Sequence, residues 1–193
     1  DEDLARATKK AGFAGASTEI GARPFGNTPV GTIPHSLQTI FDWRYGKAHA
    51  VIESVVAFDK HIEPSVSRVA LVDYRNREID DAVSVCKTLG SKLTGIRIDT
   101  AGENVMQGAV FQDKRPFWAG TGVTISGVLA IRKKLNSIGC PRVRITLSSG
   151  FGTIEKVKAF VEAERSLGVR LFDALGVGEL FPARAVTMDV VGV

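Results

Sequence analysis

Apolar and polar positions follow a repeating order along most of the chain, in which a short apolar segment precedes a loop and then an amphipathic stretch. Short segments rich in Val, Ile and Leu are typical of buried strands, whereas apolar residues that recur with the helical period are typical of helices. Because helices rather than tight turns separate the apolar segments, this order predicts a parallel sheet covered by helices. The strands expected from residue 68 onward are RVALVD, LTGIRID, VRITLSS, RLFDALGVG and AVTMDVV.

Three amphipathic stretches between these strands are expected to form helices. The first two run from about Ile79 to Leu89 and from about Ile125 to Leu135. The third is TIEKVKAFVEAERSLG, which ends at Gly168 as a helix C-terminus often does. Its expected apolar face consists of Ile154, Val157, Phe160 and Val161.

Two more apolar segments, GFAGAS and TPVGTI, lie upstream and are expected to be short strands. The second leads into SLQTIFDWRYGKAHAVIESVVAFDKHI, which is expected to form one long amphipathic helix. An open dinucleotide-binding sheet is disfavoured, because no GxGxxG follows the first strand and polar residues recur at many strand ends instead. We therefore expect an α/β fold, an incomplete TIM-like barrel of about seven parallel strands.

Composition places the chain among globular proteins, with 193 residues of which 44% are apolar and 24% are charged. This length fits a single barrel domain covering residues 1–193. The net charge of +4 comes from dispersed basic residues, which argues against nucleic acid binding but leaves phosphate or carboxylate ligands open. No segment reaches the roughly 18 continuous apolar residues of a membrane span, so no membrane association is expected.

The ends of the chain and its two cysteines lead to expectations about the full-length polypeptide and its cellular location. The opening DEDLARATKK has no signal-peptide pattern, and the chain stops at MDVVGV directly after an apolar strand. We therefore expect a piece excised from a longer polypeptide, with N- and C-terminal parts missing. Cys86 and Cys140 are interpreted as reduced thiols, which predicts a cytoplasmic protein.

Polar residues and glycines occupy the ends of the expected strands. In a parallel barrel the carboxyl ends of all strands open on the same side, so these residues are expected to converge. The segments SSGFGT and LGVGEL place glycines where backbone N–H groups can approach a phosphate, although a glycine at such a turn often serves only a positive φ. The candidates are Ser17, His35, Asp73, Arg97, Asp99, Thr100, Ser148, Ser149, Gly150, Gly176 and Gly178.

Each charged candidate has a structural alternative. Arg97 and Asp99 alternate with apolar residues and so share one face of a strand, where they form either an internal ion pair or a ligand site. His35 opens a helix, where it caps the helix, is a hydrogen-bonded residue at the rim, or serves the reaction. Asp73 either caps the next helix or binds a hydroxylated ligand.

Several segments together carry a family resemblance. In order along nearly the whole chain they are AGFAGASTEIGARPFG, TPVGTIPHS, ALVDYRNREIDDA, GIRIDT, ITLSSGF and ALGVGEL. With them the chain resembles the barrel domain of the nicotinate phosphoribosyltransferases, which are type II phosphoribosyltransferases, and more distantly that of nicotinamide phosphoribosyltransferase. The resemblance implies transfer of a phosphoribosyl group from phosphoribosyl pyrophosphate (PRPP) to nicotinate, which yields nicotinate mononucleotide and pyrophosphate for NAD biosynthesis.

The resemblance also implies roles for the candidates. Gly176 and Gly178 would hold the 5-phosphate, and the stretch from Ser148 through Ser149 to Gly150 would lie beside the ribose. Asp99 would stabilise the ribosyl unit, Arg97 would face the base and the phosphates, and Thr100 would belong to the same substrate-binding edge.

Three more roles follow from the resemblance. His35 matches the histidine that is phosphorylated when family members couple turnover to ATP hydrolysis. Ser17 stands where the nicotinamide enzyme has an aspartate; a serine accepts a carboxylate-bearing base, so it favours nicotinate. Mg²⁺ would assist the departing pyrophosphate, with Asp73 and Asp99 as the candidates to hold it.

Departures from the family pattern leave alternatives open. The base-stacking aromatic residue and further basic residues belong, in the family, to a segment before the barrel, and a homodimer partner completes the active site. Ser149 replaces an aspartate that the nicotinamide enzyme has beside the ribose. The alternatives are transfer to nicotinamide or quinolinate, a noncatalytic relative that binds phosphoribosyl ligands, and an aldolase or isomerase barrel. A Schiff-base aldolase is disfavoured because no expected strand ends in a lysine.

Overall fold

The computed structural model describes residues 2–178. The chain divides into two compact units, Asp1–Ile33 and Pro34–Val193. The expected last strand, AVTMDVV, lies outside the described residues. The organisation as a single barrel domain stays a prediction.

The first unit contains helices and loops. Its elements are α1 (Glu2–Lys10), α2 (Glu19–Ala22) and the 3-10 helix η1 (Arg23–Phe25). The prediction of strands at GFAGAS and TPVGTI was wrong for these described residues, which form no strand. One backbone hydrogen bond of 2.9 Å, from Val30 N to Ala16 O, joins the two segments, whereas a strand needs a ladder of such bonds.

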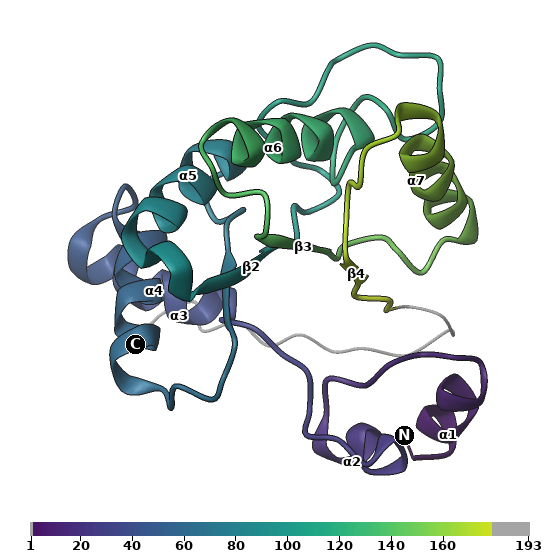
Figure 1. Cartoon of the computed structure of the whole chain (residues 1–193), viewed down its shortest axis with the longest axis horizontal. Helices are drawn as coiled ribbons and strands as arrows, with labels where there is room; N and C mark the ends of the chain where they lie inside the picture. The colour runs from purple at the N-terminus through teal and green to yellow at the C-terminus, as the bar shows by residue number, and fades with distance from the viewer. Residues whose placement is uncertain (1, 179–193) are drawn as a thin grey trace, which may run out of the picture. The chain divides into compact units, whose positions relative to one another are not determined.

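The second unit is built on a parallel sheet. Its strands are β1 (Arg68–Leu71), β2 (Leu93–Ile98), β3 (Arg144–Leu147) and β4 (Ala174–Leu175), of which Figure 1 labels the last three. They lie in the order β1-β2-β3-β4, so that each strand pairs with the next along the chain. The predicted α/β class and parallel sheet are confirmed. The described sheet has four strands where about seven were predicted, because GFAGAS and TPVGTI form none and AVTMDVV lies outside the described residues. Closure of the sheet into a TIM-like barrel stays a prediction.

Helices α5 (Glu78–Leu89), α6 (Ile125–Ser137) and α7 (Ile154–Leu167) connect these strands and pack on one face of the sheet (Figure 1). The 3-10 helix η2 (Gly90–Lys92) leads from α5 into β2. The predicted helices are confirmed, but the apolar face expected for α7 was only partly correct, because Phe160 is buried whereas Val157 and Val161 are half-buried. Its buried residues are Lys156, Phe160 and Ala163, and Ile154 is 63% exposed.

The long helix expected upstream of β1 is two helices, α3 (His35–Tyr45) and α4 (Ala50–His61). The chain breaks at Gly46, which has a φ of 83°, a conformation that glycine adopts at little cost. Gln38 anchors α3 to the sheet, because its buried Nε2 donates to the Leu71 carbonyl at the end of β1 at 2.8 Å.

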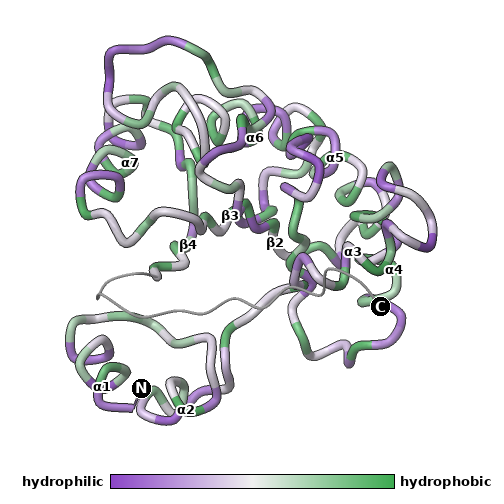
Figure 2. Tube along the Cα trace, turned by 180° about the vertical axis from the view of Figure 1, so that it is seen from behind, coloured by the Kyte–Doolittle hydropathy of each residue, from purple (hydrophilic) through white to green (hydrophobic). Residues whose placement is uncertain are grey.

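The core of the second unit lies between the sheet and its helices. Aliphatic side chains of the strands and of α6 fill it, and Figure 2 shows apolar and polar positions interleaved along the helices. The members with no exposed surface are Leu71, Ile96, Ile98, Ile125, Val128, Ile131, Leu135, Ile145 and Leu147.

Cys86 and Cys140 are joined by a disulfide, so the prediction of two reduced thiols was wrong. Cys86 lies in α5 and Cys140 in the turn between α6 and β3, so the bond ties two neighbouring crossover connections together. The two positions are far apart in sequence, and only the packing of α5 beside α6 brings them together. Within residues 2–178, no helix is long and apolar enough to cross a lipid bilayer.

Candidate functional site

His35 and Asp73 form a pair at the carboxyl end of β1. The two side chains come from the first residue of α3 and from the loop after β1, and His35 Nε2 lies 2.7 Å from Asp73 Oδ2. Neither residue caps a helix through its side chain, so the helix-cap alternatives are not realised. His35 is instead a hydrogen-bonded residue at the rim, which was its other structural alternative. Asp73 is almost fully buried, and its other oxygen, Oδ1, has no hydrogen-bond partner within the described chain.

The hydrogen bond to Asp73 raises the pKa of His35 above its ordinary value of 6.5, although partial burial acts in the opposite direction. The carboxylate of Asp99 also raises this pKa, and the guanidinium of Arg97 lowers it. His35 therefore shares one electrostatic environment with the charged residues at the end of β2, as expected for residues at neighbouring strand ends.

Arg97 and Asp99 form an ion pair, which was one of the two alternatives left open by their predicted position on the same face. Arg97 Nε also donates to Ser148 Oγ at 2.8 Å, which links the ends of β2 and β3. The Arg97 and Asp99 side chains remain 28% and 19% exposed, so a ligand has access to both. Arg97 and Asp99 thus pair with each other, and both charged groups remain partly accessible to a ligand.

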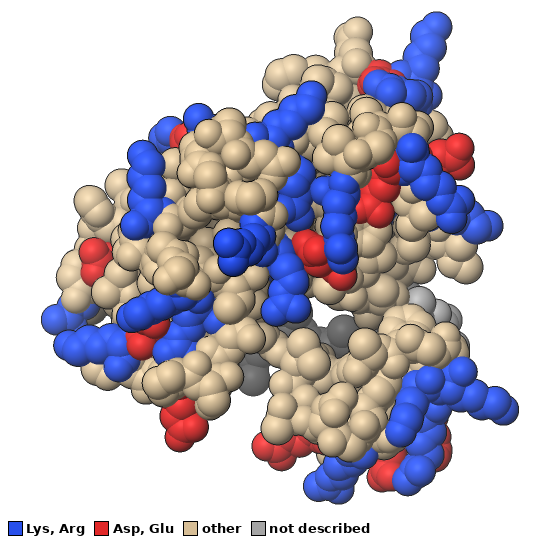
Figure 3. Space-filling model, viewed as in Figure 1, with Lys and Arg blue, Asp and Glu red and all other residues tan. Residues whose placement is uncertain are grey.

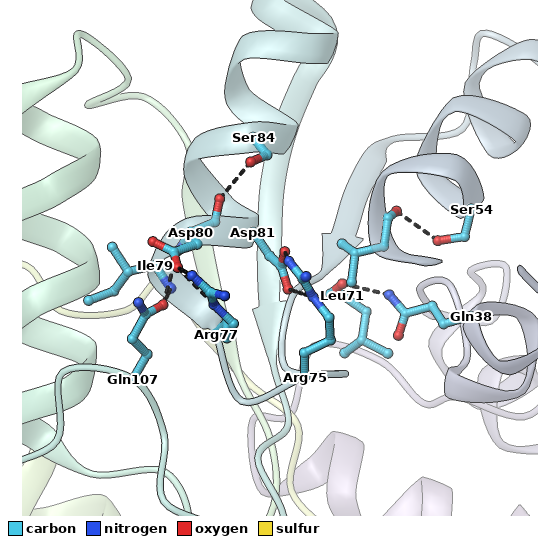
Figure 4. A network of polar contacts seen from close by, with 11 residues as sticks. Gln38, Ser54, Leu71, Arg75, Arg77, Ile79, Asp80, Asp81, Ser84 and Gln107 are labelled. Atoms are coloured by element: carbon cyan, nitrogen blue, oxygen red, sulfur yellow. Dashed lines mark hydrogen bonds and ion pairs between the residues drawn. The ribbon is translucent and has the colours of Figure 1, made fainter. Parts of the chain in front are cut away.

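A second polar network holds the loops around this centre. Glu78, at the start of α5, is completely buried, and it accepts from Thr100 Oγ1 at 2.7 Å and from the backbone N–H of Gln107 at 2.7 Å. In return, Gln107 Oε1 accepts from the N–H groups of Ile79 and Asp80, which Figure 4 shows. Burial raises the pKa of Glu78. The Thr100 hydroxyl is therefore engaged within the protein, and its predicted contact with substrate stays a prediction.

The loop from Ser148 to Gly150 has an unusual backbone. Ser149 and Gly150 both have positive φ angles, 72° and 76°. Ser148 is buried, and its N–H donates to the Ile98 carbonyl at 2.9 Å. Lys156, from the first turn of α7, donates to the Ser149 carbonyl at 3.1 Å. The ribose section predicted from sequence is thus a tightly held turn.

Gly176 lies against this turn. Its N–H donates to the Leu147 carbonyl at 2.8 Å, and a Cβ at this position would lie 3.1 Å from Ser148 Cβ. The absence of a side chain therefore permits a close approach of β3 and β4. Because the Gly176 N–H is used within the sheet, donors for a phosphate would come from the residues that follow, including the exposed Gly178.

Most of the predicted site residues thus converge at the carboxyl edge of β1 to β4. Ser17 belongs to the Asp1–Ile33 unit, and its part in base selection stays a prediction. Sequence reasoning missed Gln38, Glu78 and Lys156. Of these three, only Lys156 could have been found from the sequence. Its spacing from Phe160 and Ala163 puts it on the buried face of α7, but a lysine was not expected on that face.

Carboxylates suitable for a metal are few at this edge. Within residues 2–178, no group of three or more His, Cys, Asp or Glu side chains could hold a metal ion. Mg²⁺ in phosphate chemistry usually keeps several waters and binds one or two carboxylates together with substrate phosphates. The partnerless Asp73 Oδ1 and the accessible Asp99 carboxylate suit that kind of site.

A separate cavity of about 580 Å³ lies at the amino end of β3, away from this edge. Its buried guanidinium, Arg132, donates to the carbonyls of Arg170 and Val143 and to Asp173. These contacts fix the chain before β4. Lys and Arg are scattered with Asp and Glu over the face drawn in Figure 3, as the sequence predicted.

The chain is similar to a solved structure, the crystal structure of nicotinate-nucleotide pyrophosphorylase from Pyrococcus furiosus. The TM-score is 0.65 and the sequence identity is 30%, and the match covers 90% of this chain. The chain spans 36% of that protein's length. The likeness supports a phosphoribosyltransferase-like α/β fold. No protein-family model and no curated protein sequence matches the chain.

Proposed function

We propose that the full-length protein transfers a phosphoribosyl group from PRPP to the ring nitrogen of nicotinate, giving nicotinate mononucleotide and pyrophosphate. The observation that carries this proposal is the linked centre of Arg97, Asp99 and Ser148, which stands between the His35–Asp73 pair and the turn at Gly176. The likeness to a nicotinate-nucleotide pyrophosphorylase supports a transferase of this class, because pyrophosphorolysis of the nucleotide is the reverse of the transfer.

In this proposal the charged groups at the end of β2 have separate tasks. Breaking the anomeric C–O bond of PRPP develops positive charge on the ribose, which the carboxylate of Asp99 stabilises. Arg97, held in place by Asp99 and Ser148, faces the anionic phosphates and the nicotinate carboxylate. Asp73 and Asp99 would hold Mg²⁺, which neutralises charge on the departing pyrophosphate when bound.

We further propose that His35 couples transfer to ATP. A neutral His35 that donates its Nε2 proton to Asp73 keeps its lone pair on Nδ1. This nitrogen attacks the γ-phosphorus of ATP, the bond to the ADP oxygen breaks, and phosphohistidine and ADP result. Only the neutral imidazole has this lone pair, and the pKa of His35 is raised above 6.5. ATP stimulation should therefore increase as the pH rises through the raised pKa of His35.

Two parts of the proposal rest on the resemblance alone. They are the selection of nicotinate by Ser17 and the homodimer with a shared active site. The cytoplasmic location was predicted from reduced thiols, and the disulfide between Cys86 and Cys140 removes that support. Quinolinate is the strongest alternative base, because it also yields nicotinate mononucleotide once its second carboxylate is lost.

The deciding experiment is an assay of the full-length protein with PRPP and each of nicotinate, nicotinamide and quinolinate, with and without ATP. Pyrophosphate release with nicotinate supports the proposal. Pyrophosphate release with quinolinate only would show that quinolinate, and not nicotinate, is the base. Binding of PRPP without turnover would favour a noncatalytic relative that binds phosphoribosyl ligands.

The variant Asp99→Ala should lower kcat at least about 100-fold, on the order of a lost transition-state electrostatic contact. Asp113→Ala is the matched control, because Asp113 pairs with Arg115 on an exposed loop. Near-normal turnover by Asp99→Ala would remove Asp99 from the reacting centre.

A further inference from the structure

Lys156 is a buried ammonium beside the proposed ribose section. It is only 8% exposed, on the inner face of α7. Its Nζ donates to the Ser149 carbonyl at 3.1 Å and lies 4.7 Å from the centre of the Phe151 ring. Burial lowers the pKa of Lys156, as expected for a charge removed from water without a carboxylate partner. Placing a lysine here is costly for the fold.

The turn that Lys156 holds is also costly. Ser149 has a φ of 72°, a left-handed conformation that a non-glycine residue rarely adopts, and Gly150 follows with a φ of 76°. A Cβ on Gly150 would lie 3.2 Å from Lys156 Nζ, so the ammonium lies directly against the turn. Exposed carbonyls are normally satisfied by water, and Ser149 is only half-buried. A buried cation is therefore not required merely to satisfy this carbonyl.

The turn is coupled to the charged centre. Ser148 precedes it directly and accepts from Arg97 Nε, and Arg97 pairs with Asp99. A change in the shape of the turn is thus transmitted to the guanidinium through one hydrogen bond. Gly176 lies against Ser148, because a Cβ built on it would be 3.1 Å from Ser148 Cβ, so a change in the turn also reaches Gly176.

We infer that Lys156 is a positioning residue, which fixes the left-handed turn at Ser149 and Gly150 so that the turn and Arg97 receive the ribose phosphate part of the substrate. This inference rests on the proposed function and deepens it. Lys156 acts through the turn and takes no part in a covalent step. An arginine can replace it in this role, whereas an arginine cannot replace a lysine that forms a Schiff base.

The test is steady-state kinetics of the full-length protein with three variants. Lys156→Met keeps the aliphatic stem and removes the ammonium, and Lys156→Arg keeps a cationic donor. Lys158→Met is the matched control, because Lys158 lies on the exposed face of the same helix. We expect Lys156→Met to raise KM for PRPP about tenfold, which corresponds to ~1.4 kcal/mol of binding free energy. The KM for the base should change less than about twofold, and Lys156→Arg should recover most of the loss.

A lower melting temperature of Lys156→Met with an unchanged KM for PRPP would show a merely structural lysine and overturn the inference. Gly150→Ala offers a second route if Lys156→Met does not fold. Its Cβ disturbs the same turn, so it should raise KM for PRPP as well, and an unchanged KM would equally overturn the inference.

Failure of the proposed function is distinguishable from failure of this inference. If the wild-type protein shows no PRPP-dependent turnover, the transfer proposal fails, and ribose 5-phosphate is then titrated while the Gly150 amide is followed by NMR. A shift of this amide in the wild type and in Lys158→Met, but not in Lys156→Met, retains the positioning role. No shift in the wild type, or an equal response in all three proteins, overturns it.

Discussion

The pairing of His35 with Asp73 makes a prediction about stability as a function of pH. In the variant Asp73→Asn, the imidazolium loses its carboxylate partner at 2.7 Å. A hydrogen bond to a charged group is worth roughly 1.5–3 kcal/mol when buried. The His35 side chain is 44% exposed, so solvent screening reduces the expected contribution to about 1 kcal/mol.

The sign follows from the raised pKa of His35. A folded-state pKa above the unfolded value of 6.5 means that the folded protein binds the proton more tightly. The stabilisation is therefore fully present below pH 6.5, and it is lost as the pH rises through the folded-state pKa. The wild type should exceed Asp73→Asn in free energy of unfolding by about 1 kcal/mol more at pH 6 than at pH 9.

Urea unfolding at the two pH values measures this difference, and the comparison cancels any pH-independent effect of replacing a carboxylate with an amide. A proton NMR titration of the His35 ring should show a lower pKa in the variant. Asp42→Asn is the control, because Asp42 accepts from the neutral hydroxyl of Tyr74 at 2.8 Å and should show no such pH dependence. An identical difference in free energy of unfolding between wild type and Asp73→Asn at both pH values, with an unmoved His35 titration, would contradict stabilisation of the imidazolium by Asp73.

Three further predictions concern the surroundings of the site. Replacing both Cys86 and Cys140 with serine should lower the free energy of unfolding by about 2–4 kcal/mol, because the disulfide closes a sequence separation of 54; equal urea midpoints with and without reductant in the wild type would count against it. Gly176→Ala should cost about 1 kcal/mol and weaken PRPP binding, since its Cβ meets Ser148; a fully stable variant with normal binding would contradict the close approach. Glu78→Gln should cost about 1–3 kcal/mol in urea unfolding by leaving a buried donor unpaired, and wild-type stability would exclude Glu78 as the loop anchor.

Local pattern was sufficient for much of the second unit. The strands around Ile96 and Ile145 and the helices from residue 78 onward follow from periodicity, because burial on one side imposes a period on the sequence. The facing of Arg97 and Asp99 followed from the same rule. The break at Gly46 was missed, because a glycine within an amphipathic run is compatible with helix until its φ is fixed by packing.

The segments GFAGAS and TPVGTI were predicted to be strands from their apolar character, and neither forms one. Both have the apolar character of short strands, yet a strand exists only where a neighbour completes its hydrogen-bond ladder, and the described chain provides a single bond between them. The pattern of apolar residues indicates which side chains a segment can bury. It does not indicate whether a neighbouring strand is present to accept and donate the backbone hydrogen bonds.

By itself, the sequence determined the α/β class, the parallel order of strand and helix, and the set of polar residues at strand ends, because these depend on local periodicity and on the geometry of parallel strands. Tertiary structure alone decided which of those residues meet. It paired His35 with Asp73, bonded Arg97 to Ser148, buried Lys156 under the Ser149 turn and joined Cys86 to Cys140. Apart from the contact of Lys156, these contacts link positions 38 to 54 residues apart in the chain. Their energies depend on burial and distance, which no local pattern contains.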